Sequence, residues 1–315
     1  MFPPAGTYSV PVMKMKRRIL ILPVLLFALA LLRFPQEAAQ AVREGLLLCF
    51  ETVVPSLFPF FVVVSLLIQL GAAGALQRLF TPFMGPLFHL RGLCAAPLIA
   101  GLVGGYPAGA RTAAELVRSG QLSREEGERC LGFVNNCGPA FILSYVGVGV
   151  LHSSRAGGWL YLIHVLSALL TGMLLCRLLP EGRRSRASAP PSRAEPQPVS
   201  LSAALPTAVT GSLTSVLNIC GFVVLFRAVV GVIPMALPTA ALGAVEMVSG
   251  VAALSPGPAG FIAAAAILGW GGLSVHCQTA AVAGPLRLLY HWLGKGVQAL
   301  LSLALAAGAA QFLFP

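Results

Sequence analysis

Charged residues are scarce in this sequence, which excludes the polar surface of an ordinary soluble domain. Only 10% of the 315 residues are charged, whereas 57% are hydrophobic and the mean hydropathy is +0.85. The apolar stretches recur too often and run too long to be buried helices of a soluble core. We therefore expect an all-α, polytopic helical protein of the cell membrane, surrounded by the lipid bilayer.

Motifs for metal binding and catalysis are also missing. The seven cysteines are widely spaced and form neither a CxxC pair nor a Cys/His cluster, which argues against a disulfide framework or a zinc site. There is no HExxH motif, and the run from Gly272 to His276 lacks the final glycine of a GxSxG elbow. We expect packing cysteines, no metal, no cofactor and no enzymatic activity.

The net charge of +11 raises the question of nucleic-acid binding. The arginines, however, cluster in short runs between apolar stretches, as topology signals do, so we expect no nucleic-acid partner. The positive-inside rule then places residues 1–18, an N-terminal leader, in the cytoplasm. It also places there the segment 180–200, whose arginines and prolines predict a disordered linker.

The linker divides the chain into two halves. A first transmembrane helix is expected at 19–34, with cleavage as a signal peptide near residues 39–41 left open as the alternative. The first half, 46–179, is expected to contain a kinked span, an interfacial segment and two further crossings, at 46–70, 71–92, 141–151 and 158–176. The second half, 201–315, is expected to hold spans at 209–233 and 297–314, separated by broken segments and by a basic stretch around Lys295.

The two halves share a pattern that predicts a two-fold internal repeat. Gly104-Gly105 precedes Thr112 at nearly the same offset as Gly271-Gly272 precedes Thr279. Each half runs from an apolar span through a broken stretch to a glycine pair that opens a polar-tipped helix. Internal repeats with discontinuous helices are typical of secondary transporters. Chance similarity between two runs of small residues is the alternative.

The run GLVGGYPAGA (101–110) breaks an apolar stretch and is the first candidate site. Irregular backbone at membrane depth is tolerated only where it is buried in protein or lines a cavity. We expect a discontinuous or re-entrant helix, with Pro107 opening its second part, and candidate binding residues Gly104, Gly105, Tyr106 and Pro107. The alternative is close helix packing through the GxxxG spacing of Gly101, Gly105 and Gly109.

Three further features complete the candidate site. Glu246 is the only formally charged residue between Arg227 and Arg287, and a lone ionisable group in such a stretch is a functional candidate unless it reaches an interface. Two amides precede Gly138-Pro139, where they could bind a polar solute or cap a helix. The remaining candidates follow the second glycine pair. These residues are Asn135 and Asn136, then Ser274, His276 and Gln278.

These motifs, taken in order, resemble a known family. GLVGGYPAGA, the pattern from Gly120 to Pro139, EMVSG and WGGLSVHxQ look like the sporulation integral membrane proteins that carry a nucleoside-recognition, or Gate, domain. The resemblance covers roughly residues 46–290 and implies kinship with the gate regions of nucleoside transporters and of ferrous-iron transport protein B. It puts six residues on the family's motif positions: Tyr106, Asn135, Asn136, Glu246, Ser274 and His276.

Two functions follow as expectations. The first is a transporter or permease for a small polar solute, nucleoside-like or ionic, acting in formation of the spore envelope. The alternative is a non-transporting membrane scaffold of a sporulation assembly, and a homo-oligomer is left open in both.

Overall fold

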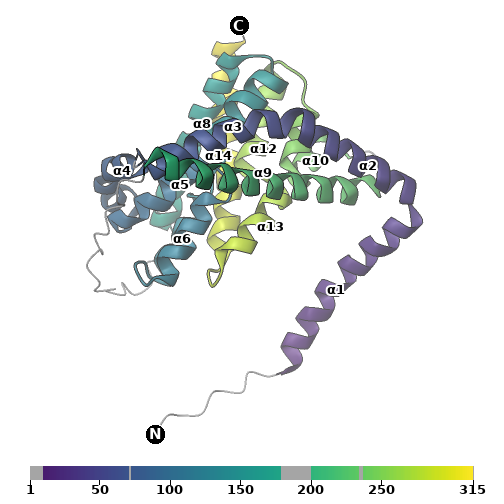
Figure 1. The fold of residues 1–315 in the computed structure, drawn as a ribbon, viewed down its shortest axis with the longest axis horizontal. Coiled ribbons are helices and arrows are strands. Elements are labelled where there is room, and N and C mark those ends of the chain that lie inside the picture. The colour runs from purple at the N-terminus through teal and green to yellow at the C-terminus, as the bar shows by residue number, and fades with distance from the viewer. Residues whose placement is uncertain (1–9, 71, 179–199, 234–236, 315) are drawn as a thin grey trace.

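The computed structural model describes residues 10–70, 72–178, 200–233 and 237–314, and these contain helices but no β-strand (Figure 1). Four helical segments of the described chain are long and apolar enough to cross a membrane: α8 (Ser154–Leu178), α9 (Leu201–Gly231), the α12–α13 segment (Pro258–Ala283) and α14 (Leu289–Leu313). Two further pairs of helices are sharply bent, and counting each pair as one span gives six. The protein is therefore an all-α, polytopic membrane protein with discontinuous helices, as expected.

The first bent pair is formed by α1 (Val10–Arg33) and α2 (Pro35–Leu48), which meet at 101°. Pro35 has no N–H to continue the hydrogen bonds of α1, and it forces Phe34 out of the helical region, so a new helix begins there. Helix α1 projects away from the body of the protein (Figure 1). It contains the expected first span, but residues 10–18 of the expected leader are helical too; residues 1–9 and the linker residues 179–199 lie outside the described residues.

Helix α2 continues through a π-helical turn, η1 (Cys49–Val53), into α3 (Val54–Gln69), which completes the expected span at 46–70. Pro55 lies two residues after this turn and cannot donate to the carbonyl of Glu51, so a local change in hydrogen bonding is needed here. Helix α9 packs along both α2 and α3 (Figure 1). It begins earlier than expected, at Leu201 rather than near residue 209.

The second bent pair corrects the expectation of a simple interfacial segment at 71–92. Helix α4 (Ala72–Phe88) turns by 115° into η2 (Gly92–Cys94) and α5 (Ala95–Gly104), so the two arms together form a broken span or a re-entrant loop. Arg91 occupies the bend. The expected segment is therefore helical over residues 72–88 and ends in a sharp bend that the expectation did not include.

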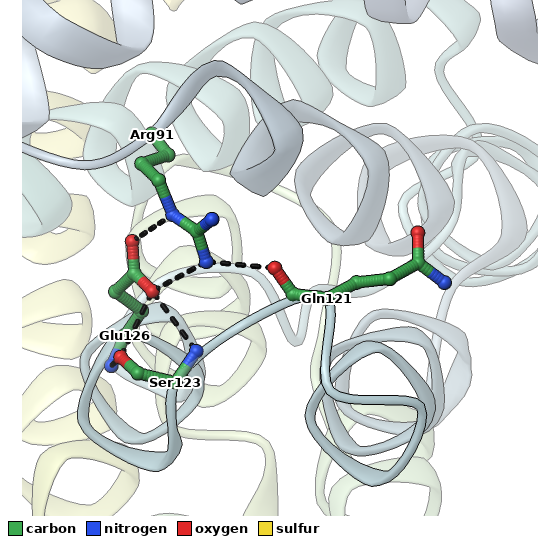
Figure 2. Close-up of polar contacts among 4 residues, drawn as sticks. All are labelled: Arg91, Gln121, Ser123 and Glu126. Atoms are coloured by element: carbon green, nitrogen blue, oxygen red, sulfur yellow. Dashed lines mark hydrogen bonds and ion pairs between the residues drawn. The ribbon is translucent and has the colours of Figure 1, made fainter. Parts of the chain in front are cut away.

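The side chain of Arg91 joins the bend to the start of α7 (Arg124–Leu131). Its guanidinium donates to both carboxylate oxygens of Glu126, at 2.6 and 2.7 Å, and to the carbonyl of Gln121 at 2.7 Å (Figure 2). Glu126 also accepts from the backbone N–H of Ser123, and the Ser123 hydroxyl accepts from the Glu126 N–H, which confirms the capping box expected from the sequence. Burial alone raises the pKa of Glu126, but the bonds from Arg91 and Ser123 outweigh it and hold that pKa below its ordinary value.

Residues 140–150 do not form the separate crossing that we expected. They form an 11-residue π-helix, η3 (Ala140–Val150). Even at the α-helical rise of about 1.5 Å per residue this covers only about half of a hydrocarbon core of about 30 Å. The next helix, α8, packs against α12 and α14. The start of α14 also differs from expectation, because Leu289 and not Val297 begins the helix, which brings Lys295 inside it.

Candidate functional site

Four breaks in helices lie at the centre of the candidate site. The first separates α5 from α6 (Ala108–Arg118) at residues 105–107, and the second follows α7 at residues 132–139. The third is at Glu246, between α10 (Thr239–Val245) and α11 (Met247–Ala252). The fourth is at Gly271, between α12 (Pro258–Trp270) and α13 (Gly272–Ala283). The interruption expected in the run 101–110 is thus present, with Gly104 as the last helical residue before it.

Backbone contacts bring these breaks together. A Cβ atom on Gly105 would lie 3.0 Å from the backbone nitrogen of Gly138, which joins the first break to the second. One on Gly272 would lie 2.9 Å from the nitrogen of Met247, and one on Gly271 would lie 3.1 Å from the hydroxyl of Tyr106. The breaks therefore meet in one place, although they are far apart in the sequence.

The alternative interpretation of the glycine spacing is also correct for two of the three positions. A Cβ on Gly101 or on Gly109 would collide with the carbonyl oxygen of Val134, at 1.6 and 2.0 Å. These two glycines therefore serve the packing of α5 and α6 against the end of α7. Gly105 differs, because its φ of 75° and ψ of −168° belong to a region essentially restricted to glycine.

A small cavity of about 30 Å³ lies where the breaks meet. Five of the ten candidate residues line it, together with Cys137, Gly138 and apolar side chains from α3, η3 and α9; these five are Gly105, Tyr106, Glu246, Ser274 and Gln278. Gly104 precedes the first break and Pro107 is its last residue, and neither lines the cavity. Since one water needs about 10–15 Å³, the cavity in this conformation has room for about two water molecules.

Glu246 is buried, with only 2% of its surface exposed, and it does not reach an interface. Its carboxylate accepts hydrogen bonds from the backbone N–H groups of Val248 at 3.0 Å and Ser249 at 2.6 Å, so it caps α11. The hydroxyl of Ser274 donates to the same carboxylate at 3.3 Å. Glu246 thus has a structural role as a helix cap, and it also lines the cavity.

A buried lysine lies behind Tyr106. The Lys295 ammonium donates to the hydroxyl of Tyr106 and to Oε1 of Gln298, both at 2.8 Å, and weakly to the backbone oxygen of Asn135 at 3.5 Å. Sequence reasoning missed Lys295 and Gln298 because the lysine was interpreted as part of a basic stretch before the last span. One signal could have found them: His291, Lys295, Gln298 and Ser302 lie on one helical face, at intervals of four, three and four residues, and all four are buried.

The two asparagines belong to this network and do not line the cavity. Asn135 donates to the hydroxyl of Thr279 at 2.6 Å, which joins the second break to α13. Asn136 donates to the carbonyl of Phe133 and accepts from Gln298 at 3.0 Å. The buried Oδ1 of Asn135 has no hydrogen-bond partner within the described residues, which is typical of a site that binds water or a ligand.

His276 points to a different cluster. Its Nδ1 lies 2.8 Å from Nε2 of His291, and its ring lies 4.0 Å from the ring of Trp292 and 4.5 Å from that of Trp270, measured between centroids. The structure therefore separates His276 from Ser274 and Gln278. Within the described part of the chain, no group of three or more His, Cys, Asp or Glu residues could hold a metal ion.

The fold and the site define a polytopic helical membrane protein whose discontinuous helices meet at a small, mainly apolar cavity, into which Glu246, Ser274 and Gln278 bring polar groups. The family model described as nucleoside recognition, Gate, matches residues 50–283. The chain therefore belongs to the Gate family, and all four breaks lie within the matched region.

A curated relative extends this comparison. The chain is similar to the sporulation integral membrane protein YlbJ of Bacillus subtilis (strain 168), with 35% identity over 208 residues. The similar region covers 61% of this chain and 50% of the relative, so the chain spans about half the length of the curated relative it matches. No solved structure matches the chain significantly.

Proposed function

We propose that the chain is a permease that moves a small polar solute through the cavity where the four breaks meet. The convergence of these breaks on one buried cavity carries the proposal. The lining is mainly apolar, yet Glu246, Ser274 and Gln278 are buried in it, and packing alone gives no reason to place such polar groups there, because their burial is costly unless it is compensated. The proposal assigns no catalytic residue.

The groups that line the cavity favour an uncharged or cationic solute with hydrogen-bond donors. Glu246 offers carboxylate oxygens, and Gln278 can both donate and accept. The volume of about 30 Å³ admits a solute of water or ion size in this conformation. A nucleoside would bind only after the helices around the cavity move apart, and the discontinuous helices supply the joints for such a movement.

A role in spore formation is the second part of the proposal. It rests on the similarity to the sporulation integral membrane protein of Bacillus subtilis. The test is complementation: a Bacillus subtilis strain without that protein would express this chain, and heat-resistant spores would be counted. A count no higher than that of the empty-vector strain would contradict this part.

Two measurements on purified protein test the transport part. A thermal-shift screen with nucleosides, phosphates, amino acids and monovalent and divalent cations would identify a ligand, because a ligand that binds the native state raises Tm by mass action. Uptake of each hit into proteoliposomes would follow. Complementation without stabilisation or uptake by any of these solutes would favour the scaffold, and the close packing of Gly101 and Gly109 on Val134 is the observation that suits that alternative.

We also propose the orientation expected from the arginines. Arg118 lies near the α13–α14 connection, while Arg124 pairs with Glu128, which in turn accepts from the backbone N–H of Arg287. These arginines surround the start of α7, and the positive-inside rule assigns that side, the N-terminus and residues 180–200 to the cytoplasm. Ser119→Cys, at an exposed position between α6 and α7, should react with an impermeant maleimide in inside-out vesicles but not in intact cells.

A further inference from the structure

Lys295 is the most deeply buried cation of the described chain, with 1% of its surface exposed. It makes no ion pair with any described residue. An isolated ammonium in a membrane protein is costly unless its environment replaces the hydration shell. In this structure, oxygen atoms of the protein take the place of the water molecules around the Lys295 ammonium.

Three oxygen atoms surround the ammonium, and they come from three separate parts of the fold. The Tyr106 hydroxyl belongs to the first break, the Asn135 carbonyl to the second, and the Gln298 amide to α14 itself. The ammonium has three N–H donors and no acceptor, so each oxygen can take one donor. Neutral oxygens, one of them an unwound backbone carbonyl, are also the ligands that bind monovalent cations at discontinuous membrane helices.

We propose that Lys295 places its ammonium in a monovalent-cation site, so that a cation tethered to the chain occupies the position that a cation from solution would otherwise take. The ammonium connects the first and second breaks to α14 through these three hydrogen bonds. It also fixes the Tyr106 hydroxyl as an acceptor toward Lys295, which leaves the hydroxyl proton for another partner. Among the described residues, the acceptor for that proton is the carbonyl of Leu268, at a long 3.4 Å, and the cavity lies beside it.

Chemical rescue tests the site without knowledge of any transported solute. Lys295→Ala removes three methylene groups and the ammonium, and n-propylammonium contains the same atoms. The variant would be extracted and purified with n-propylammonium present, so that it folds, and its Tm would be measured after exchange into other salts. We expect a Tm well below that of the wild type in choline chloride and a saturable recovery of most of the loss in n-propylammonium, with smaller recovery in ammonium or potassium.

Two comparisons make the result specific. Tetramethylammonium has the charge but no N–H donor, and it should not restore the Tm. Leu160→Ala opens an apolar cavity in α8, where Leu160 is 1% exposed, and none of the cations should restore its Tm. Equal rescue of both variants by n-propylammonium would overturn the proposal, because it would reflect filling of apolar space. An unchanged Tm in Lys295→Met would also overturn it, because the charge would then be dispensable.

A transport measurement extends the inference, and this step rests on the proposed function. Uridine, as the probe, would be offered to wild-type proteoliposomes in sodium, potassium or choline buffers. Equal uptake in the three buffers is expected if the cation is tethered, and a strict requirement for sodium would overturn that expectation. Absence of uridine uptake in all buffers, together with rescue of Lys295→Ala, would contradict uridine permeation while leaving the cation site intact.

Discussion

The ammonium of Lys295 lies 2.8 Å from the hydroxyl of Tyr106, and the two residues are 189 positions apart in the sequence. One belongs to the first expected half of the chain and the other to the second. Asn135 and Thr279, and Asn136 and Gln298, connect the same two halves. The matching glycine pairs both lie at helix breaks, but the two-fold repeat itself stays a prediction.

Removing the Tyr106 hydroxyl should destabilise the protein more than removing another tyrosine hydroxyl. Tyr106→Phe leaves a buried ammonium with one acceptor fewer, and such a loss costs about 1–3 kcal/mol. Tyr161→Phe is the matched control, because its hydroxyl donates only to the carbonyl of Leu102 at 3.1 Å. The measurement is thermal unfolding in detergent. Equal losses of stability in the two variants would show that the ammonium does not depend on Tyr106.

Substitution of Gly105 tests the contact between the first two breaks. Gly105→Ala places a methyl group 3.0 Å from the Gly138 nitrogen and holds alanine in a backbone region that costs about 1–3 kcal/mol. Gly211→Ala in α9 is the control, because nothing lies within 4 Å of its Cβ position and alanine is favoured in a helix by about 1 kcal/mol. We expect the Tm to fall in the first variant and to rise or stay unchanged in the second. A wild-type Tm for Gly105→Ala would contradict the close approach.

The first, second and fourth breaks could be predicted from the sequence because their causes are local, whereas the break at Glu246 was not predicted. Glycine pairs, proline and the Ser123–Glu126 capping box act within a few residues, and the structure has a helix end or start at each of them. The burial of Glu246 followed from its isolation among apolar residues. Its function as a cap of α11 depends on the helix that starts at Met247, which directs the backbone N–H groups of Val248 and Ser249 toward the carboxylate.

The position of Lys295 could not be predicted in the same way, because it depends on distant contacts. A Cβ on the preceding Gly294 would lie 1.8 Å from the carbonyl oxygen of Gly132, so glycine lets α14 approach the end of α7. The acceptors for the ammonium then come from Tyr106 and Asn135. A lysine near the start of an apolar helix is ordinarily a topology signal. The polar face that Lys295 shares with Gln298 indicates burial, but only these contacts show which groups bind the ammonium. The separation of His276 from the cavity likewise depends on Trp292 and His291.

The contact between Arg91 and Glu126 predicts a dependence of stability on pH. Glu126 has a pKa below its ordinary value of 4.5, so it stabilises the folded protein fully above that value, and the contribution is lost as pH falls through the lower, folded pKa. Because Arg91 is 38% exposed, solvent screening limits the contribution to less than about 1 kcal/mol. Glu126→Gln should flatten the acid side of the plot of Tm against pH.

Glu125→Gln is the control for this measurement. Glu125 lies in the first turn of α7 beside Glu126, so the helix dipole acts on both carboxylates. Unlike Glu126, Glu125 makes no ion pair with a described residue. Its plot of Tm against pH should keep the wild-type slope. An identical slope in wild type and Glu126→Gln would mean that the bonds from Arg91 do not hold Glu126 ionised.

Replacement of Glu246 distinguishes its function as a helix cap from a function in the cavity. Gln has one acceptor oxygen where Glu has two, so Glu246→Gln weakens the cap of α11 and should cost about 0.5–2 kcal/mol. Ser123→Ala is matched to it, because it removes the cap of α7, far from the cavity lining, at a similar cost. We expect both variants to fold with modestly lower Tm. Only Glu246→Gln should lose uptake of the solute identified by screening, together with complementation of sporulation. Undiminished uptake and complementation in Glu246→Gln would mean that Glu246 serves only as a helix cap, and would favour the scaffold hypothesis.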